Sequence, residues 1–218
     1  MDFQLCRLFL TAAVCGFVTL GSTSLTRAQQ FQVGGLAGYQ WGGGFDKSRS
    51  ATGDVTQIDL NIDNGVGFGL TVDTPVSQKG YLTFLIAYQN TNMNAREAGT
   101  ADATTLFNLD LYYVHAGFLY EFGAGGLRPF AGIGAGITYF NGQSGYGNDT
   151  RASGSLFVGV KKFVNAHVGL RAQAAFLGTY VPSGEVFCDG LNNCFTFTNS
   201  SLMTQFHVTA GLIVAFKL

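Results

Sequence analysis

The residues that could carry chemistry in this chain are few and far apart. His115, His167 and His207 fall in three separate stretches and show none of the short spacings that metal sites use. A serine hydrolase needs a nucleophile beside a histidine and an acid, and the nearest fragment, His207-Val208-Thr209, offers no serine. We therefore predict no catalytic residue, no metal site and no cofactor, and we expect that the chain is not an enzyme.

The stretch 59–65 resembles the start of a calcium-binding loop. Its sixth position should be glycine and is Asn64, and its twelfth should be glutamate and is Leu70. Asp59 and Asp63 also alternate with apolar residues, as they would on one face of a β-strand. We interpret these aspartates as residues of a strand face rather than as calcium ligands.

The remaining candidates are charged residues on the less apolar faces of the predicted strands. They are Glu121, Lys161 and Arg171 near one end of the strands, and Asp59, Asp63 and Asp110 near the other. If these faces line a narrow interior, the charges must pair, because an unpaired buried charge is costly. We predict a structural cluster in the lumen, in which Arg171 pairs with Glu121. A narrow, gated ion path along the same residues is the alternative.

Two cysteines, Cys188 and Cys194, lie close together in a polar stretch. Their spacing excludes a CxxC redox motif. In an exported protein, such a pair is expected to form a local disulfide.

Export is predicted by the first residues of the chain. Arg7 precedes the apolar run 8–20, and small and polar residues then lead to Ala28. This order of segments is typical of a secretory signal peptide. We therefore predict a signal peptide over residues 1–28, cleaved near Ala28, and a single domain over residues 29–218.

The elements that must position these residues are β-strands. From Phe206 to Leu218 every second residue is apolar, whereas those between are mostly polar or small, which predicts a strand with one apolar face. The same alternation predicts eight strands, at about 31–43, 58–72, 81–92, 106–122, 128–140, 154–163, 168–181 and 201–218. In the second strand, one outward face is expected to hold Ile58, Leu60, Ile62, Val66, Phe68, Leu70 and Val72.

Composition and connection lengths favour a barrel in a membrane. Only 11% of the 218 residues are charged, against about 25% in a typical soluble domain. Beyond the predicted signal peptide no apolar run reaches the roughly 18 residues of a transmembrane helix. The connections alternate between long and short, as they do in transmembrane barrels. We predict an all-β fold: an eight-stranded antiparallel up-and-down transmembrane β-barrel, closed by pairing of the first and last strands.

A soluble secreted barrel of the lipocalin type is the structural alternative. It would turn a face rich in charged residues toward water. Here the less apolar faces hold mainly Gly, Thr, Asn and Gln, which suits a narrow lumen better. The net charge of −1 gives no basis for binding nucleic acid.

Three stretches carry a family resemblance: RPFAGIGAG at 128–136, GVKKF at 159–163 and NAHVGLR at 165–171. They resemble the outer-membrane protein A-like β-barrel superfamily of Gram-negative bacteria, which includes OmpX-like, OmpW-like and opacity barrels. The resemblance implies a monomer in the outer membrane, in contact with lipid or lipopolysaccharide and inserted by the barrel-assembly machinery. Phe216 and Leu218, at the end of the last outward row, are the expected C-terminal assembly signal.

The expected role is structural or surface-exposed, such as adhesion or envelope integrity. The predicted outer loops are short and nearly balanced in charge, so they identify no class of ligand. A narrow channel for small solutes or ions is the first alternative, and a soluble ligand-binding barrel is the second.

Overall fold

The computed structural model of the protein describes residues 30–50, 57–97, 103–122, 126–143, 147–183, 186–188, 194–197 and 200–217. The predicted signal peptide, residues 1–28, and Leu218 lie outside these ranges. Within the described ranges, no helix is long and apolar enough to cross a membrane.

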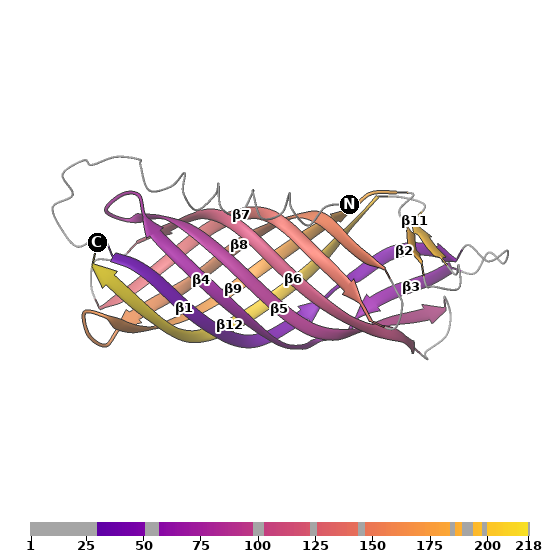
Figure 1. The fold of residues 1–218 in the computed structure, drawn as a ribbon, viewed down its shortest axis with the longest axis horizontal. Helices are drawn as coiled ribbons and strands as arrows, with labels where there is room; N and C mark the ends of the chain where they lie inside the picture. The colour runs from indigo at the N-terminus through magenta and orange to yellow at the C-terminus, as the bar shows by residue number, and fades with distance from the viewer. Residues whose placement is uncertain are drawn as a thin grey trace, which may run out of the picture.

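Eight strands form a closed antiparallel barrel (Figure 1). They are β1 (Gln30–Gly42), β4 (Gly65–Pro75), β5 (Gly80–Glu97), β6 (Ala103–Glu121), β7 (Leu127–Gly142), β8 (Asn148–Phe163), β9 (Val168–Val181) and β12 (Ser201–Lys217). Strand β1 pairs with β12, for example with Val33 opposite Val214, and this pairing closes the ring. The predicted fold and its closing strand pair are confirmed.

The two ends of the barrel differ. Short connections join β4 to β5, β6 to β7 and β8 to β9 at what we call the turn end, where β12 also finishes. At the opposite, loop end, β2 (Gly44–Ser50), β3 (Gln57–Ile62), β10 (Val186–Cys188) and β11 (Cys194–Phe197) extend the sheet beyond the ring (Figure 1). The chain bends into β2 at Gly42 and Gly43, whose positive φ angles of 85° and 115° favour glycine.

The strands run further toward the loop end than the sequence predicted. Polar stretches at 44–56, 93–105 and 141–152 were expected to be loops, but β2, β5, β6, β7 and β8 each continue into them. The polar residues of these stretches remain in register within the sheet, as where Asn92 lies opposite Asn108. Polarity alone is therefore a poor marker of strand ends in this chain.

The predicted second strand is interrupted at Asp63 and Asn64, between β3 and β4. Leu60 and Ile62 are buried inside, whereas Val66 and Phe68 are exposed outside. The expectation that all of them share an outward face is therefore wrong. Asp63 and Asn64 lie outside both strands, so the alternation of faces is not continuous across them. Even-numbered residues therefore point inward in β3 and outward in β4.

The outward face of the barrel is a belt of exposed apolar side chains. Phe68 and Ile133, from different strands, are 57% and 60% exposed. A row of three tyrosines, Tyr88, Tyr112 and Tyr139, bounds part of this belt on the loop side, where they lie opposite one another on β5, β6 and β7. Their ring centroids are 5.0 and 6.1 Å apart. Aromatic rows of this kind mark the membrane interface of transmembrane barrels.

Polarity reverses across the tyrosine row. Along the outward face of β5, the apolar Phe84 and Ile86 come before Tyr88, and the polar Asn90 and Asn92 come after it. Toward the loop end, many inward side chains are instead apolar and buried, beside the polar Gln89, Thr91 and Arg151. We call the apolar ones the apolar layer: Leu60, Ile62, Met93, Phe107, Leu109, Leu111, Phe140, Leu177, Val181 and Met203. Beyond the tyrosine row the sheet thus has the apolar interior and polar exterior of a water-soluble protein.

Inward glycines allow neighbouring strands to approach closely. A Cβ atom built on Gly211 would lie 1.8 Å from the carbonyl oxygen of Gly35 on β1. A Cβ atom on Gly136 would lie 1.9 Å from the carbonyl oxygen of Val114. Since no real contact is that short, any larger residue at these positions must push two paired strands apart.

We predict that Gly211→Ala lowers the free energy of unfolding by about 1–3 kcal/mol, the usual cost of overpacking. Gly35→Ala is the matched control, because Gly35 lies in the same β1–β12 pair, opposite Leu212, and a Cβ atom there meets nothing within 4 Å. Urea unfolding in lipid vesicles, followed by the fluorescence of Trp41, the single tryptophan, measures both. Equal stabilities of the two variants would contradict the close approach.

Candidate functional site

Near the turn end, the lumen contains four buried charged residues that we call the ionic cluster: Asp73, Glu121, Lys161 and Arg171. The partly exposed Arg128 pairs with Glu121 at 3.8 Å from the edge of this cluster. The Lys161 side chain is 0% exposed and donates hydrogen bonds to three oxygens. Its Nζ lies 2.9 Å from Asp73 Oδ2, 2.9 Å from Glu121 Oε1 and 2.8 Å from Gln32 Oε1. These partners come from β1, β4 and β6, so one ammonium group ties together strands from different sides of the lumen.

Arg171 pairs with Asp73 rather than with Glu121. Its Nη1 lies 2.7 Å from Asp73 Oδ2, and the Thr83 hydroxyl donates to the other oxygen of that carboxylate at 2.5 Å. The predicted Arg171–Glu121 pair is therefore wrong, although both side chains do face the lumen. Asp73 was not among the predicted lumen residues, because the second strand was predicted to end at residue 72, whereas β4 continues to Pro75.

Aromatic rings cover the cations of the ionic cluster. Lys161 Nζ lies 4.8 Å from the ring centroid of Tyr81 and 5.4 Å from that of Phe130. The guanidinium carbon of Arg171 lies 4.7 Å from the Phe130 centroid. Cation–π contacts and ion pairs together compensate the loss of hydration of these charges.

The aspartates expected near the other end of the lumen lie elsewhere. Asp63 and Asp110 bond to outward side chains beyond the tyrosine row, where Asn92 and Asn94 donate to Asp63 at 3.1 and 2.5 Å. Asp110 accepts from the Tyr88 hydroxyl at 2.9 Å. They are thus part of the polar exterior, and their assignment to the lumen is wrong. Asp59 lies in β3 opposite Arg96 in backbone register, and its side chain is outside the described part of the chain.

The middle of the lumen holds a histidine between two serines. His115 Nδ1 lies 2.9 Å from Ser155 Oγ, and its Nε2 lies 2.7 Å from Ser153 Oγ. The serine–histidine contact was not predicted, because His115 lies on β6 and the two serines lie on β8, and β7 separates these strands in the sheet. Hydroxyls engage both ring nitrogens, so neither is left for the carboxylate of a catalytic triad. The imidazole is buried, and we interpret the group as structural.

A second polar group lies beside it. Tyr113 and His207 have their ring centroids 5.5 Å apart, and the Tyr113 hydroxyl donates to Gln205 Oε1. His207 Nε2 lies 3.4 Å from the same oxygen, and Gln205 Nε2 donates to Gln89 Oε1 at 3.3 Å. Side chains from several strands therefore bond to one another in the mid-lumen.

The apolar layer closes the lumen above this polar middle. Leu111 and Phe140 are 0% exposed and Leu109 is 1% exposed. We expected mainly small and polar residues inside. The signal was present, because Phe107, Leu109 and Leu111 alternate on the face opposite Tyr112, but the strand was judged by its outward residues.

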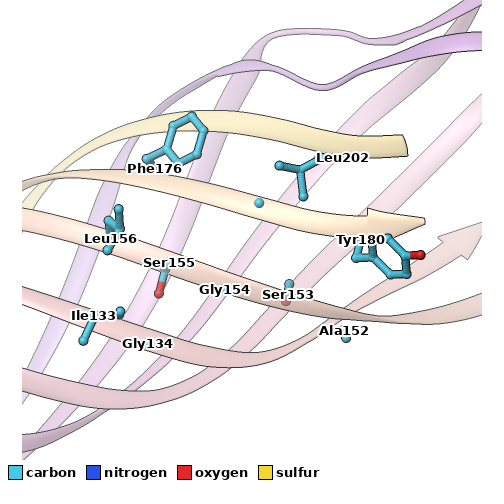
Figure 2. Close-up of a pocket in the computed structure, with 11 residues that line it drawn as sticks. Ile133, Gly134, Ala152, Ser153, Gly154, Ser155, Leu156, Phe176, Tyr180 and Leu202 are labelled. Carbon is cyan, nitrogen blue, oxygen red and sulfur yellow. The ribbon is translucent and has the colours of Figure 1, made fainter. Parts of the chain in front are cut away.

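The largest hollows among those found lie on the outside of the barrel. One groove of about 450 Å³ crosses β7, β8, β9 and β12, and Figure 2 shows Ile133, Leu156, Phe176 and Leu202 around it. All four side chains are exposed and face outward. The groove therefore belongs to the apolar belt and has no connection with the ionic cluster.

The two cysteines are placed as direct neighbours by the backbone. Strands β10 and β11 form a hairpin in which Cys188 lies opposite Cys194. Opposed residues of antiparallel strands have Cα atoms about 4.5–5.5 Å apart, which is within the span of a disulfide. The bond itself stays a prediction, since these side chains lie outside the described part of the chain.

We predict that Lys161→Met lowers the free energy of unfolding by about 3–5 kcal/mol, because it leaves two buried carboxylates without their shared cation. Lys162→Met is the matched control, since the neighbouring lysine points to the exposed outer face. Urea unfolding of both variants in the same vesicles provides the comparison. A Lys161→Met barrel as stable as the Lys162→Met barrel would show that the cluster contributes nothing to stability.

Comparison with known proteins concerns the fold. No protein-family model and no curated protein matches the chain. It superposes on the outer membrane protein OprG from Pseudomonas aeruginosa with a TM-score of 0.62 and 14% identity, covering 88% of this chain and 98% of that one. For the outer membrane protein AlkL in DMPC bilayers the TM-score is 0.55 and the identity 13%, over 92% of this chain and 96% of AlkL. For Neisserial surface protein A the TM-score is 0.51 and the identity 17%, over 85% of this chain and 97% of that protein. This chain therefore has the fold of the small outer-membrane β-barrels.

Proposed function

We propose that the protein is a structural, surface-exposed barrel of the Gram-negative outer membrane whose lumen is closed. The observation that carries this proposal is the fully buried Lys161, bonded to strands on different sides of the lumen. A hydrated path would have to break these bonds, because they join strands across the lumen.

The apolar layer supports the same conclusion from the other end. An ion entering from the loop end would meet a packed set of leucine, methionine and phenylalanine side chains. Loss of hydration without compensating ligands is costly for any ion. Two barriers of different chemistry, one ionic and one apolar, therefore stand in series along the lumen.

The membrane location is supported by the apolar belt and by the tyrosine row. A soluble barrel would hold its belt in water, where exposed apolar patches of this extent lead to association. The small-ligand barrel considered as an alternative also needs an interior cavity, whereas the lumen described here is filled. The outer-membrane fold of OprG, AlkL and Neisserial surface protein A agrees with a location in that membrane.

The surface role is supported by the sheet that projects beyond the tyrosine row. Its polar exterior, with Asn90, Asn92 and Asp110, is suited to water outside the membrane. A rigid projecting wall of this kind can present loops in adhesion or can contribute to envelope integrity. Phe216, exposed on the outward face of β12, remains the proposed signal for the barrel-assembly machinery, together with Leu218.

Conductance across a planar lipid bilayer tests the proposal. We expect the reconstituted protein to give no stepwise conductance, while a general porin reconstituted in the same way gives clear steps. Reproducible steps that change with Lys161→Met but not with Lys162→Met would overturn the closed lumen and would support the alternative of a narrow ion channel.

A further inference from the structure

A small internal cavity lies between the ionic cluster and the histidines of the mid-lumen. Its volume is about 10 Å³, and Leu36, Gln40, Gln173, Ala175, His207 and Thr209 contribute to its lining. Phe68, Gly69, Leu85 and Ala87 complete the lining, so most of it is apolar, and the amide, hydroxyl and imidazole groups come from the four polar residues. Such a cavity is at the lower limit of the space that a single water molecule needs.

Two polar atoms of this lining have no partner in the protein. They are Gln40 Oε1 and Thr209 Oγ1, whose residues are 1% and 8% exposed. A buried oxygen without a hydrogen bond costs about 1–3 kcal/mol, so native structures rarely leave two of them in one place. The cavity and the two unpartnered atoms are separate observations, and they coincide.

We propose that this cavity is a binding site for one structural water molecule. A water molecule can donate to the amide oxygen of Gln40 and bond to the Thr209 hydroxyl in either direction. It keeps further bonds available for Gln173 or His207, which gives it the two to four partners that buried waters have. A metal cation fits less well, because hard cations require about six oxygen ligands.

The position of the site gives the water molecule a structural role. Gln173 accepts a hydrogen bond from Arg171 Nε at 2.8 Å and so belongs to the network of the ionic cluster. His207 belongs to the network of Gln205 and Tyr113. A water molecule in the cavity connects these two networks into one set of hydrogen bonds, which ends at the apolar layer and provides no path through the barrel.

A crystal structure at a resolution that places ordered water tests the site directly. We expect an ordered water within hydrogen-bonding distance of both Gln40 Oε1 and Thr209 Oγ1. An empty cavity, or a direct hydrogen bond between Gln40 and Thr209, would overturn the proposal.

Urea unfolding of Thr209→Val gives a second test, in which the sign of the effect decides. If water bonds to the hydroxyl, replacing it by a methyl group lowers the unfolding midpoint. If the cavity is dry, the same substitution removes an unsatisfied buried oxygen, and the midpoint stays the same or rises. Thr138→Val is the matched control, because Thr138 bonds directly to Thr179 at 2.8 Å and its loss is expected to lower the midpoint. A Thr209→Val midpoint at or above that of the unaltered protein, with Thr138→Val below it, would contradict the water site.

Discussion

Closure of the sheet is the constraint on which the other features of this protein depend. In hydrocarbon no water is available to bond a free backbone N–H or C=O group, so a membrane sheet must pair its first strand with its last. Here β1 and β12 pair along the whole of β1, from Gln30 opposite Lys217 to Gly42 opposite Gln205. Once the ring is closed, alternate residues must face either lipid or a narrow lumen. Inward glycines such as Gly136 and Gly211 then permit close strand contact, and inward charges must find partners.

Inward side chains find their partners in successive layers along the lumen. Near the turn end, Asp73 and Lys161 each have two partners of opposite charge, so the removal of either would expose more than one charge at once. In the middle, histidine, serine, glutamine and tyrosine side chains bond to one another. Toward the loop end the filling becomes apolar, at the level where the exterior becomes polar. This change matches the boundary between lipid and water, so a single strand such as β5 behaves as a membrane strand over one part and as a strand of a soluble protein over the other.

Much of this arrangement could be predicted from residue alternation. The apolar residues of β12 recur with the period of a strand, and the inward direction of Glu121, Lys161 and Arg171 follows from the same counting. The choice of partners could not be predicted, because Asp73 and Arg171 meet across the lumen. That meeting depends on the stagger of the whole barrel, which the pattern of a single strand does not contain.

Other errors arose where a local rule changes along a strand. The break at Asp63 and Asn64 reverses the inward and outward faces between β3 and β4, and its sign in the sequence is Asn64, the polar residue that interrupts the predicted apolar row. The outward direction of Asp110 could have been predicted, because Asp110 lies two residues before the outward Tyr112 on the same strand. The extension of strands past the tyrosine row was hidden because polar outward residues were taken for loops.

The central claim is that the membrane boundary on this side of the barrel lies at the tyrosine row. Nitroxide labels at positions 84, 86, 90 and 92 of β5 test it most directly, in a barrel reconstituted without its other cysteines. We expect collisions with oxygen dissolved in lipid to dominate at Phe84 and Ile86, and collisions with a water-soluble nickel complex to dominate at Asn90 and Asn92. Equal accessibility to the nickel complex at all four positions, or shielding from it at all four, would contradict the account.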